Sequence, residues 1–209
     1  MRPLLFLFWV SFSAMGFAQP TLQHYGGMQL HEGAQVGLYG SFVNQAPFEQ
    51  QAGLFGFYGN KEIRISGDFA LVLSEVEIFR GPSVFLDQSV GVADNLSFID
   101  GDFRTDKALP QIYITLLQNA ITIGESDVSK VNGYVTMINQ SRMVFPVGDA
   151  SEYRPLTLEG EVFPIAKCAY LREDPNTPST FPPFRTDLKP RTIEAISTAE
   201  FWRLEGSNT

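Results

Sequence analysis

Four aspartates in a short stretch of the chain have the chemistry of a calcium site. Asp100 and Asp102 flank Gly101, Asp106 follows, and Asp94 precedes them. Carboxylate oxygens at close spacing are the ligands that Ca²⁺ prefers in proteins. However, the chain has neither the closing glutamate of an EF-hand loop nor the repeat signature of calcium-binding solenoids. We therefore interpret these residues as turn-forming acids and expect no metal or cofactor, with Asp100, Asp102 and Asp106 as the candidate ligands if a metal does bind.

A second candidate site lies at and after the turn FPVGD (145–149). Asp149, Tyr153 and Arg154 could bind an anion or a sugar, with the Arg154 guanidinium donating two parallel hydrogen bonds. Turn chemistry accounts for the same residue types, because Gly148 permits a positive φ and Asp149 can accept hydrogen bonds from its own backbone. We favour this structural interpretation and keep Asp149, Tyr153 and Arg154 as candidate ligand-binding residues.

Paired carboxylates could also act as a catalytic acid and base. Glu75 and Glu77 are two residues apart, so on a strand their side chains point to the same face. Their alternation with apolar neighbours is typical of the solvated face of a strand, which is the interpretation we favour. The sequence shows no nucleophile elbow, and His24 and His31 have no metal-ligand spacing to each other or to Cys168, which we expect to be a small core residue. We assign no catalytic residue.

Aromatic side chains could bind sugars if they are exposed. The chain has 18 Phe, 7 Tyr and 2 Trp. Tyr25, Tyr39 and Tyr58 are candidates for stacking on sugar rings. With so many aromatic residues in one chain, we expect stacked ladders of aromatic rings in the core.

Short strands must position all of these residues. Between Gln19 and about Leu117, apolar or alternating runs of three to six residues are separated by Gly, Asn and Asp, and helical periodicity is absent. An antiparallel sandwich or barrel and a parallel β-solenoid both fit this pattern. Hairpin signals are few and the runs are short, which favours the solenoid. We therefore predict an all-β fold, with a β-solenoid (parallel β-helix-like) region over residues 19–125.

The sequence changes character near Ser126. Longer β-rich runs follow, then a proline-rich loop in which fixed φ angles and missing amide donors exclude regular structure. A last strand is predicted over Thr198–Leu204, close to the end of the chain. We predict a β-sandwich-like region over residues 126–209, and we expect this region to be incomplete and the chain to be the N-terminal part of a longer protein.

Residues 1–18 are typical of a signal peptide. Arg2 supplies a positive charge, LLFLFWV (4–10) is an apolar run, and GFA (16–18) places small residues at the −3 and −1 positions. The apolar run is shorter than the roughly 20 residues that span a bilayer. We expect cleavage before Gln19, export to the cell surface or the medium, and no transmembrane segment in the mature chain.

The charge of the chain limits its partners. The net charge is −8, from 15 Lys and Arg against 23 Asp and Glu. Nucleic-acid binding needs clustered Lys and Arg that neutralise phosphates, and the sequence contains no such cluster. We therefore expect no nucleic-acid partner, and we expect extracellular glycans or other surface proteins instead.

A series of motifs runs along the chain in the order GSFVN (40–44), ISG (65–67), VNGYV (131–135), FPVGD (145–149), YRPL (153–156) and EFW (200–202). This series resembles the N-terminal region of exported surface proteins of Bacteroidetes, the kind that carry a type IX secretion or gliding-motility-associated C-terminal sorting domain. The resemblance implies a set of parallel coils that leads, through the NGYV strand and the FPVG turn, into a β-sandwich-like part. It carries over no catalytic residue, and the sorting domain has no counterpart among these motifs.

Together these observations predict a non-catalytic region of an exported cell-surface protein with a structural or adhesive role. A carbohydrate-binding module is one alternative. A β-helical enzyme that degrades polysaccharides is another, and it requires charged residues of adjacent coils to project into one groove. The residues that could do so are Asp94, Asp100, Asp102 and Arg104.

Overall fold

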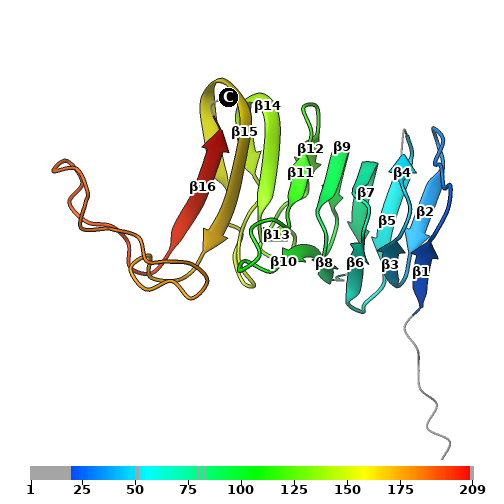
Figure 1. The fold of residues 1–209 in the computed structure, drawn as a ribbon, viewed down its shortest axis with the longest axis horizontal. Coiled ribbons are helices and arrows are strands. Elements are labelled where there is room, and N and C mark those ends of the chain that lie inside the picture. Colours follow the sequence, from blue (N-terminus) through cyan, green and yellow to red (C-terminus); the bar gives the residue numbers. More distant parts are fainter. Residues whose placement is uncertain (1–19, 50–51, 80, 82, 208–209) are drawn as a thin grey trace, which may run out of the picture.

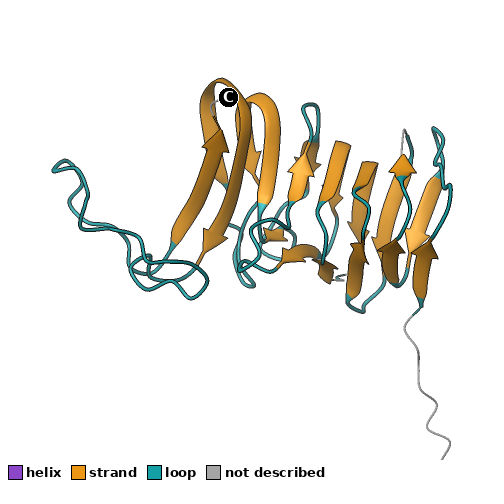
Figure 2. Cartoon of the chain, in the orientation of Figure 1, coloured by secondary structure: helices purple, strands orange, loops and turns teal. Residues whose placement is uncertain are grey.

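The computed structural model describes residues 20–49, 52–79, 81 and 83–207. In this part of the chain every regular element is a strand, and no helix is present (Figure 2). The strands wind into a β-solenoid of about five turns, which confirms the predicted all-β fold and solenoid (Figure 1). The predicted signal peptide, 1–18, lies outside the described residues.

Sheet A forms one side of the solenoid. It has six strands, and each strand pairs in parallel with the next one along the chain that belongs to this sheet. The strands are β1 (Thr21–His24), β3 (Ser41–Asn44), β6 (Ile63–Gly67), β8 (Ser83–Leu86), β10 (Asp102–Thr105) and β13 (Val131–Asn132).

Sheet B forms the other side and has ten strands. Its parallel part contains β2 (Gln35–Leu38), β5 (Leu54–Tyr58), β7 (Leu71–Phe79), β9 (Val90–Phe98), β11 (Ile114–Leu116) and β14 (Val135–Phe145). Two antiparallel strands, β15 (Leu156–Leu171) and β16 (Phe201–Ser207), continue it beyond β14. Short β4 (Phe48–Glu49) pairs with β7, and β12 (Ile121–Ile123) pairs with β9.

Each coil places its strands directly on those of the coil before it. Thr21 pairs with Ser41, a step of 20 residues, whereas Phe103 pairs with Val131, a step of 28 residues. The extra residues of the longer coil leave the strand register intact, because only the strand positions stack. The same register aligns the outer side chains of sheet A, so that the guanidinium carbons of Arg64 and Arg104 each lie 5.5 Å from the centroid of the Phe85 ring between them.

The corners of the coils depend on close backbone approach. Gly67 has φ 133°, and a Cβ there would lie 2.0 Å from the carbonyl oxygen of Asn44 in the preceding coil. The buried Asn44 amide donates to the Phe69 carbonyl (2.8 Å) and its oxygen bonds His24 Nδ1 (2.7 Å). These bonds satisfy the Asn44 amide and His24 Nδ1 where the chain leaves sheet A, while His24 Nε2 has no hydrogen-bond partner among the described residues.

Aromatic rings fill the space between the two sheets, as predicted. Six phenylalanines from successive coils meet edge to face, with neighbouring ring centroids 5.6–6.3 Å apart, a geometry that adds to the burial of their apolar area. Most are fully buried, and they belong to one continuous core. The rings are those of Phe42, Phe48, Phe55, Phe57, Phe98 and Phe103.

Both ends of this core are covered. At the first coil, the loop between β1 and β2 buries Leu30 in the core and packs Met28 against it. At the last coil, Val147 pairs in parallel with Val131, because the Val131 amide donates to the Pro146 carbonyl (2.8 Å) and the Gly148 amide to the Val131 carbonyl (3.0 Å). The FPVGD stretch is therefore one more rung of sheet A.

The predicted β-sandwich-like region over 126–209 is not confirmed. The strands β14, β15 and β16 form an antiparallel ribbon, but this ribbon extends sheet B of the solenoid. Residues of the same hydrophobic core extend from Leu30 to Tyr170, across the predicted boundary. The proline-rich loop packs its Phe181 and Phe184 beside Phe201 on the outside of this ribbon.

We predict that Phe57→Ala lowers the free energy of unfolding by about 3–5 kcal/mol, because it removes a buried ring from the middle of the phenylalanine stack. Urea denaturation followed by circular dichroism measures this change. The control is Phe184→Ala in the loop, where the side chain is 43% exposed. Equal losses in the two variants would contradict the assigned role of the stack.

Candidate functional site

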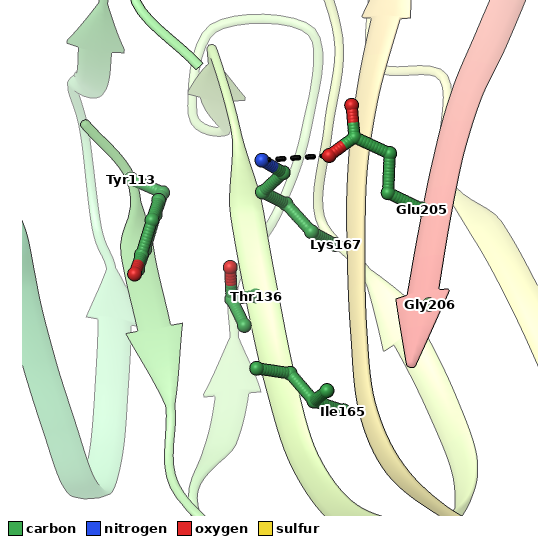
Figure 3. A pocket seen from close by; sticks show the side chains of 6 residues that line it. All are labelled: Tyr113, Thr136, Ile165, Lys167, Glu205 and Gly206. Atoms are coloured by element: carbon green, nitrogen blue, oxygen red, sulfur yellow. Dashed lines mark ion pairs between the residues drawn. The ribbon is translucent and has the colours of Figure 1, made fainter. Parts of the chain in front are cut away.

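A groove on the outer face of sheet B brings a lysine and a glutamate together beside an aromatic ring. It encloses about 250 Å³ and is lined by residues from the segment before β11 and from β14, β15 and β16 (Figure 3). Figure 3 shows the heads of Lys167 and Glu205 meeting at one end of the groove and Ile165 at the other. The lining residues are Tyr113, Thr136, Ile165, Lys167, Glu205 and Gly206.

Strand register brings the polar groups of the groove into one row. Thr136 lies opposite Lys167 in the β14–β15 pair, and Lys167 lies opposite Glu205 in the β15–β16 pair. Directly opposite residues in antiparallel strands project from the same face of the sheet, so all three side chains point outward. Tyr113, immediately before β11, closes the side of the groove away from Glu205.

Lys167 is held by an anion, a carbonyl and two aromatic rings. Its Nζ lies 2.8 Å from Glu205 Oε2 and donates to the Pro110 carbonyl (3.0 Å). The same Nζ is 5.9 Å from the centroid of the Tyr113 ring and 5.3 Å from that of Tyr134, within cation–π range. The ammonium group is therefore fixed in place at the end of the groove.

Glu205 is the carboxylate partner in this arrangement. Burial opposes its ionisation, but hydrogen bonding and charge from Lys167, together with the Arg203 charge, outweigh burial and hold the pKa of Glu205 below its usual value. Arg203 Nε lies 2.6 Å from Glu205 Oε1. Glu205 is thus ionised at neutral pH and bridges two cations, which makes it an acceptor with a fixed orientation.

Thr136 provides a hydroxyl in the middle of the groove. The residue is 2% exposed, and its Oγ1 has no hydrogen-bond partner among the described residues. A buried hydroxyl without a partner is costly, but this oxygen is shielded from solvent beneath the groove and is not open to a ligand. The accessible aromatic ring, ammonium and carboxylate can hold one small polyhydroxylated ring.

Sequence reasoning did not single out any residue of this groove. The usable signal was Lys167, the only charged residue in the otherwise apolar run FPIAKCAYL (163–171). A charged residue in such a run faces away from the core and needs a partner. Its partners come from positions as distant as 110 and 205, which only the strand pairing reveals.

The structure separates the three predicted ligand residues Asp149, Tyr153 and Arg154. Asp149 and Arg154 belong to one network of ion pairs, since both Arg154 and Arg172 pair with Glu152, and Arg172 Nε lies 2.6 Å from Asp149 Oδ2. Tyr153 lines a different hollow, together with residues of β12 and β14. The three therefore do not form a single binding site.

Asp149 is occupied by its own turn. Its Oδ1 accepts from the backbone amides of Ser151 and Glu152, each at 2.8 Å, which is the geometry of an Asx turn. Burial opposes ionisation, but these amide hydrogen bonds, the Ser151 hydroxyl and the Arg172 charge hold the pKa of Asp149 below its usual value. Both carboxylate oxygens of Asp149 thus have partners within the chain.

Arg154 and Tyr153 have separate surroundings. Besides Glu152, Arg154 Nε lies 3.6 Å from Glu200 Oε2, and the Arg154 carbonyl accepts from Trp202 Nε1 at 2.9 Å. This contact ties the turn to β16. For Tyr153, burial and then the nearby Glu125 charge raise the pKa of the phenol to about 12.

The expected positive φ of Gly148 is wrong, since Gly148 is not among the glycines of the described chain that adopt one. Glycine is needed there for space instead. A Cβ would lie 2.2 Å from the Glu152 carbonyl oxygen and 2.6 Å from Cδ of the buried Lys130. The Gly148 carbonyl in turn accepts from Lys107 Nζ (3.3 Å), and burial lowers the pKa of Lys107 to about 8.

The candidate metal ligands Asp100, Asp102 and Asp106 do not converge. Asp102 accepts from the Ser83 hydroxyl (2.7 Å) and pairs with Arg104 (2.8 Å). Asp106 accepts from the Ala108 amide (2.8 Å), as a turn residue does. Among the described residues no group of three or more His, Cys, Asp or Glu side chains could hold a metal ion.

The arrangement required by the enzyme alternative is not formed. Asp94 belongs to β9 of sheet B and accepts from the Ser74 hydroxyl. Asp102 and Arg104 belong to β10 of sheet A, where they pair with each other. These side chains lie on two different sheets and do not line one groove.

The other residues considered as catalytic or metal-binding candidates lie in separate parts of the structure. Glu75 and Glu77 lie on the outer side of β7, where Glu77 accepts from the Tyr58 hydroxyl (3.1 Å). Cys168 is fully buried, and burial raises the pKa of its thiol to about 12. His24 is buried beside Asn44.

Two of the three candidate tyrosines form a pair. Tyr39 is exposed, and its ring centroid lies 5.6 Å from that of Tyr58, whereas Tyr25 is exposed elsewhere and donates to Gln23 (2.8 Å). The exposed His31 lies in the loop that covers the first coil.

No known protein family, curated protein or solved structure matches the chain. Within the described residues, none of the segments is a helix with the length and apolar character needed to cross a membrane. The fold places the protein in the class of β-solenoids. What this protein does must be inferred from the geometry of its surface.

We predict that Gly148→Ala destabilises the chain by about 1–3 kcal/mol or more, because the added Cβ has no room beside the Glu152 carbonyl and Lys130. Thermal and urea denaturation measure the loss. Gly26→Ala is the control, since a Cβ at Gly26 would meet nothing within 4 Å. Unchanged stability of Gly148→Ala would mean that the turn relaxes freely and is not a fixed rung of sheet A.

Proposed function

We propose that this chain is a non-catalytic structural or adhesive region of an exported cell-surface protein. The observation that carries the proposal is the parallel stack of about five turns with both ends of its core covered. Such a stack presents long, regular faces and gains stability from each added coil, which suits display and contact at a surface. The signal-peptide pattern of residues 1–18 and the resemblance to Bacteroidetes surface proteins with type IX sorting domains support the same role.

Many of the exposed charged side chains form ion pairs within the chain, as expected of a structural protein. The Arg64 guanidinium pairs with Asp87 and Glu62, Arg142 pairs with Glu159, and Arg185 pairs with Asp187. These pairs are exposed and each adds little stability, so the stability of the stack comes from its core.

Export and surface display can be tested directly. In the source cells we expect the protein to begin at Gln19 and to be digested when protease is added to intact cells. N-terminal sequencing and immunoblotting before and after protease treatment provide the two measurements. A protein that retains Met1 and stays protected in intact cells would rule out the proposed location.

A carbohydrate-binding role is a second candidate, favoured by the groove around Lys167. Its volume of about 250 Å³ lies just below the range of typical ligand pockets, so it suits a single ring rather than a long chain. The Tyr113 ring offers an apolar face, while Glu205 and Lys167 offer an acceptor and a donor for ring hydroxyls. Thr136 lies beneath these groups and forms the floor of the groove.

We predict that the purified chain binds glycans on an array, and that Lys167→Met weakens the strongest binding at least about tenfold, equivalent to about 1.4 kcal/mol. Titration calorimetry with the selected sugar measures the affinities. Lys189→Met is the matched control, because Lys189 lies in the exposed loop away from the groove. No binding across the array, or equal binding by all variants, would exclude the groove as a sugar site.

A further inference from the structure

The strand β16 ends sheet B with an open backbone edge. It pairs with β15 on one side, and no backbone hydrogen bond of the described residues reaches its other side. An open edge is a template for pairing with another strand, and proteins usually block such edges with Pro, Lys or a bulge. The strand FWRLEGS (201–207) contains no Pro and no Lys, and its register with β15 is continuous.

One face of β16 is apolar and only partly covered. Trp202 and Leu204 lie opposite the buried Tyr170 and Cys168 of β15, so they face the core side of sheet B, yet they are 37% and 45% exposed. Sheet A ends with β13 and the Pro146–Gly148 rung, and β16 lies beyond its last strand (Figure 1). Among the described residues no strand of sheet A therefore lies opposite the core-side face of β16, where the Arg154 carbonyl contacts Trp202 and Leu204 stays open.

The opposite face of β16 carries one positive and one negative side chain. Arg203 and Glu205 are neighbours on this face and pair with each other at 2.6 Å. They lie on either side of Leu204, one positive and one negative. A strand with opposite charges placed symmetrically about a central residue is complementary to an antiparallel copy of itself.

We propose that the chain forms a symmetric dimer in which β16 pairs antiparallel with β16 of a second copy, centred on Leu204. In this register Leu204 lies opposite Leu204 of the partner, Arg203 lies opposite Glu205 on both sides of the axis, and Trp202 lies opposite Gly206. Each ion pair is made twice, as a two-fold interface requires. The glycine leaves room for the Trp202 indole, and sheet B continues through the axis.

The neighbouring registers are disfavoured by charge. Centring the pair on Arg203 places two arginines directly opposite one another, and centring it on Glu205 does the same with two glutamates. Like charges in directly opposite positions destabilise a pair of strands. Of the three registers, the one centred on Leu204 places an arginine opposite a glutamate at both charged positions.

The dimer can be tested by sedimentation equilibrium of the purified chain. We expect a mass that rises with concentration to that of two chains. Leu204→Lys should weaken the dimer at least tenfold, because it places two ammonium groups opposite one another at the axis. The control is Leu188→Lys, the same substitution at a loop residue that is 70% exposed.

A mixing experiment identifies the register. Arg203→Glu and Glu205→Arg should each be monomeric alone, because each places like charges at both ion pairs. Mixed in equal amounts they should form a heterodimer, since every opposed pair is then of opposite charge, and the double variant with both changes should dimerise like the parent. Loss of the intrachain Arg203–Glu205 pair cannot explain recovery on mixing, because neither single variant contains that pair.

Three outcomes would overturn the proposal. The first is a single monomeric species up to about 1 mM, the weak end of measured affinities. The second is a dimer that Leu204→Lys leaves unchanged, which would place the interface elsewhere. The third is the failure of the two folded charge variants to associate on mixing, with circular dichroism establishing that each is folded.

Discussion

The register of parallel backbone pairing between successive coils governs the rest of this structure. A slip of one residue in any strand would move its inward side chains to the outside, so every coil must keep the same phase. That phase sends a phenylalanine ring inward from most coils and lets the rings meet edge to face. It also stacks Arg64, Phe85 and Arg104 on the outside of sheet A. The core and the outer surface are two results of one alignment.

A stack of coils needs a different solution at each end. The first coil is covered by its own loop, which inserts Leu30. The last coil is followed by a long ribbon that continues sheet B while its connecting turn adds a rung to sheet A. The network of Asp149, Glu152, Arg154 and Arg172 lies at this turn, so its charges hold the end of the solenoid and do not form an empty anion site.

The solenoid could be predicted from the sequence because short β-rich runs and the lack of helical periodicity are local properties. The sandwich-like region could not be judged in the same way, because the choice between a new sheet and an extension of sheet B depends on pairing across the chain. Tyr153 was grouped with Asp149 and Arg154 by sequence proximity, yet the turn directs it into a different hollow. Gly148 was correctly marked as special, but the cause is crowding by Glu152 and Lys130 and not the backbone angle.

The antiparallel ribbon at the end of the solenoid also affects how the chain assembles. The β14–β15 pair closes a turn of about ten residues, since Phe145 pairs with Leu156, whereas each rung of the solenoid joins residues 16 or more positions apart. Contacts that are close in sequence form first, because they cost less chain entropy. The β14–β15 hairpin is thus the strand pairing that costs least chain entropy to close, by a margin of only about 0.6 kcal/mol for each doubling of loop length. The ribbon is therefore the part of the structure that depends least on the coils beside it, because its first two strands meet without any contribution from them.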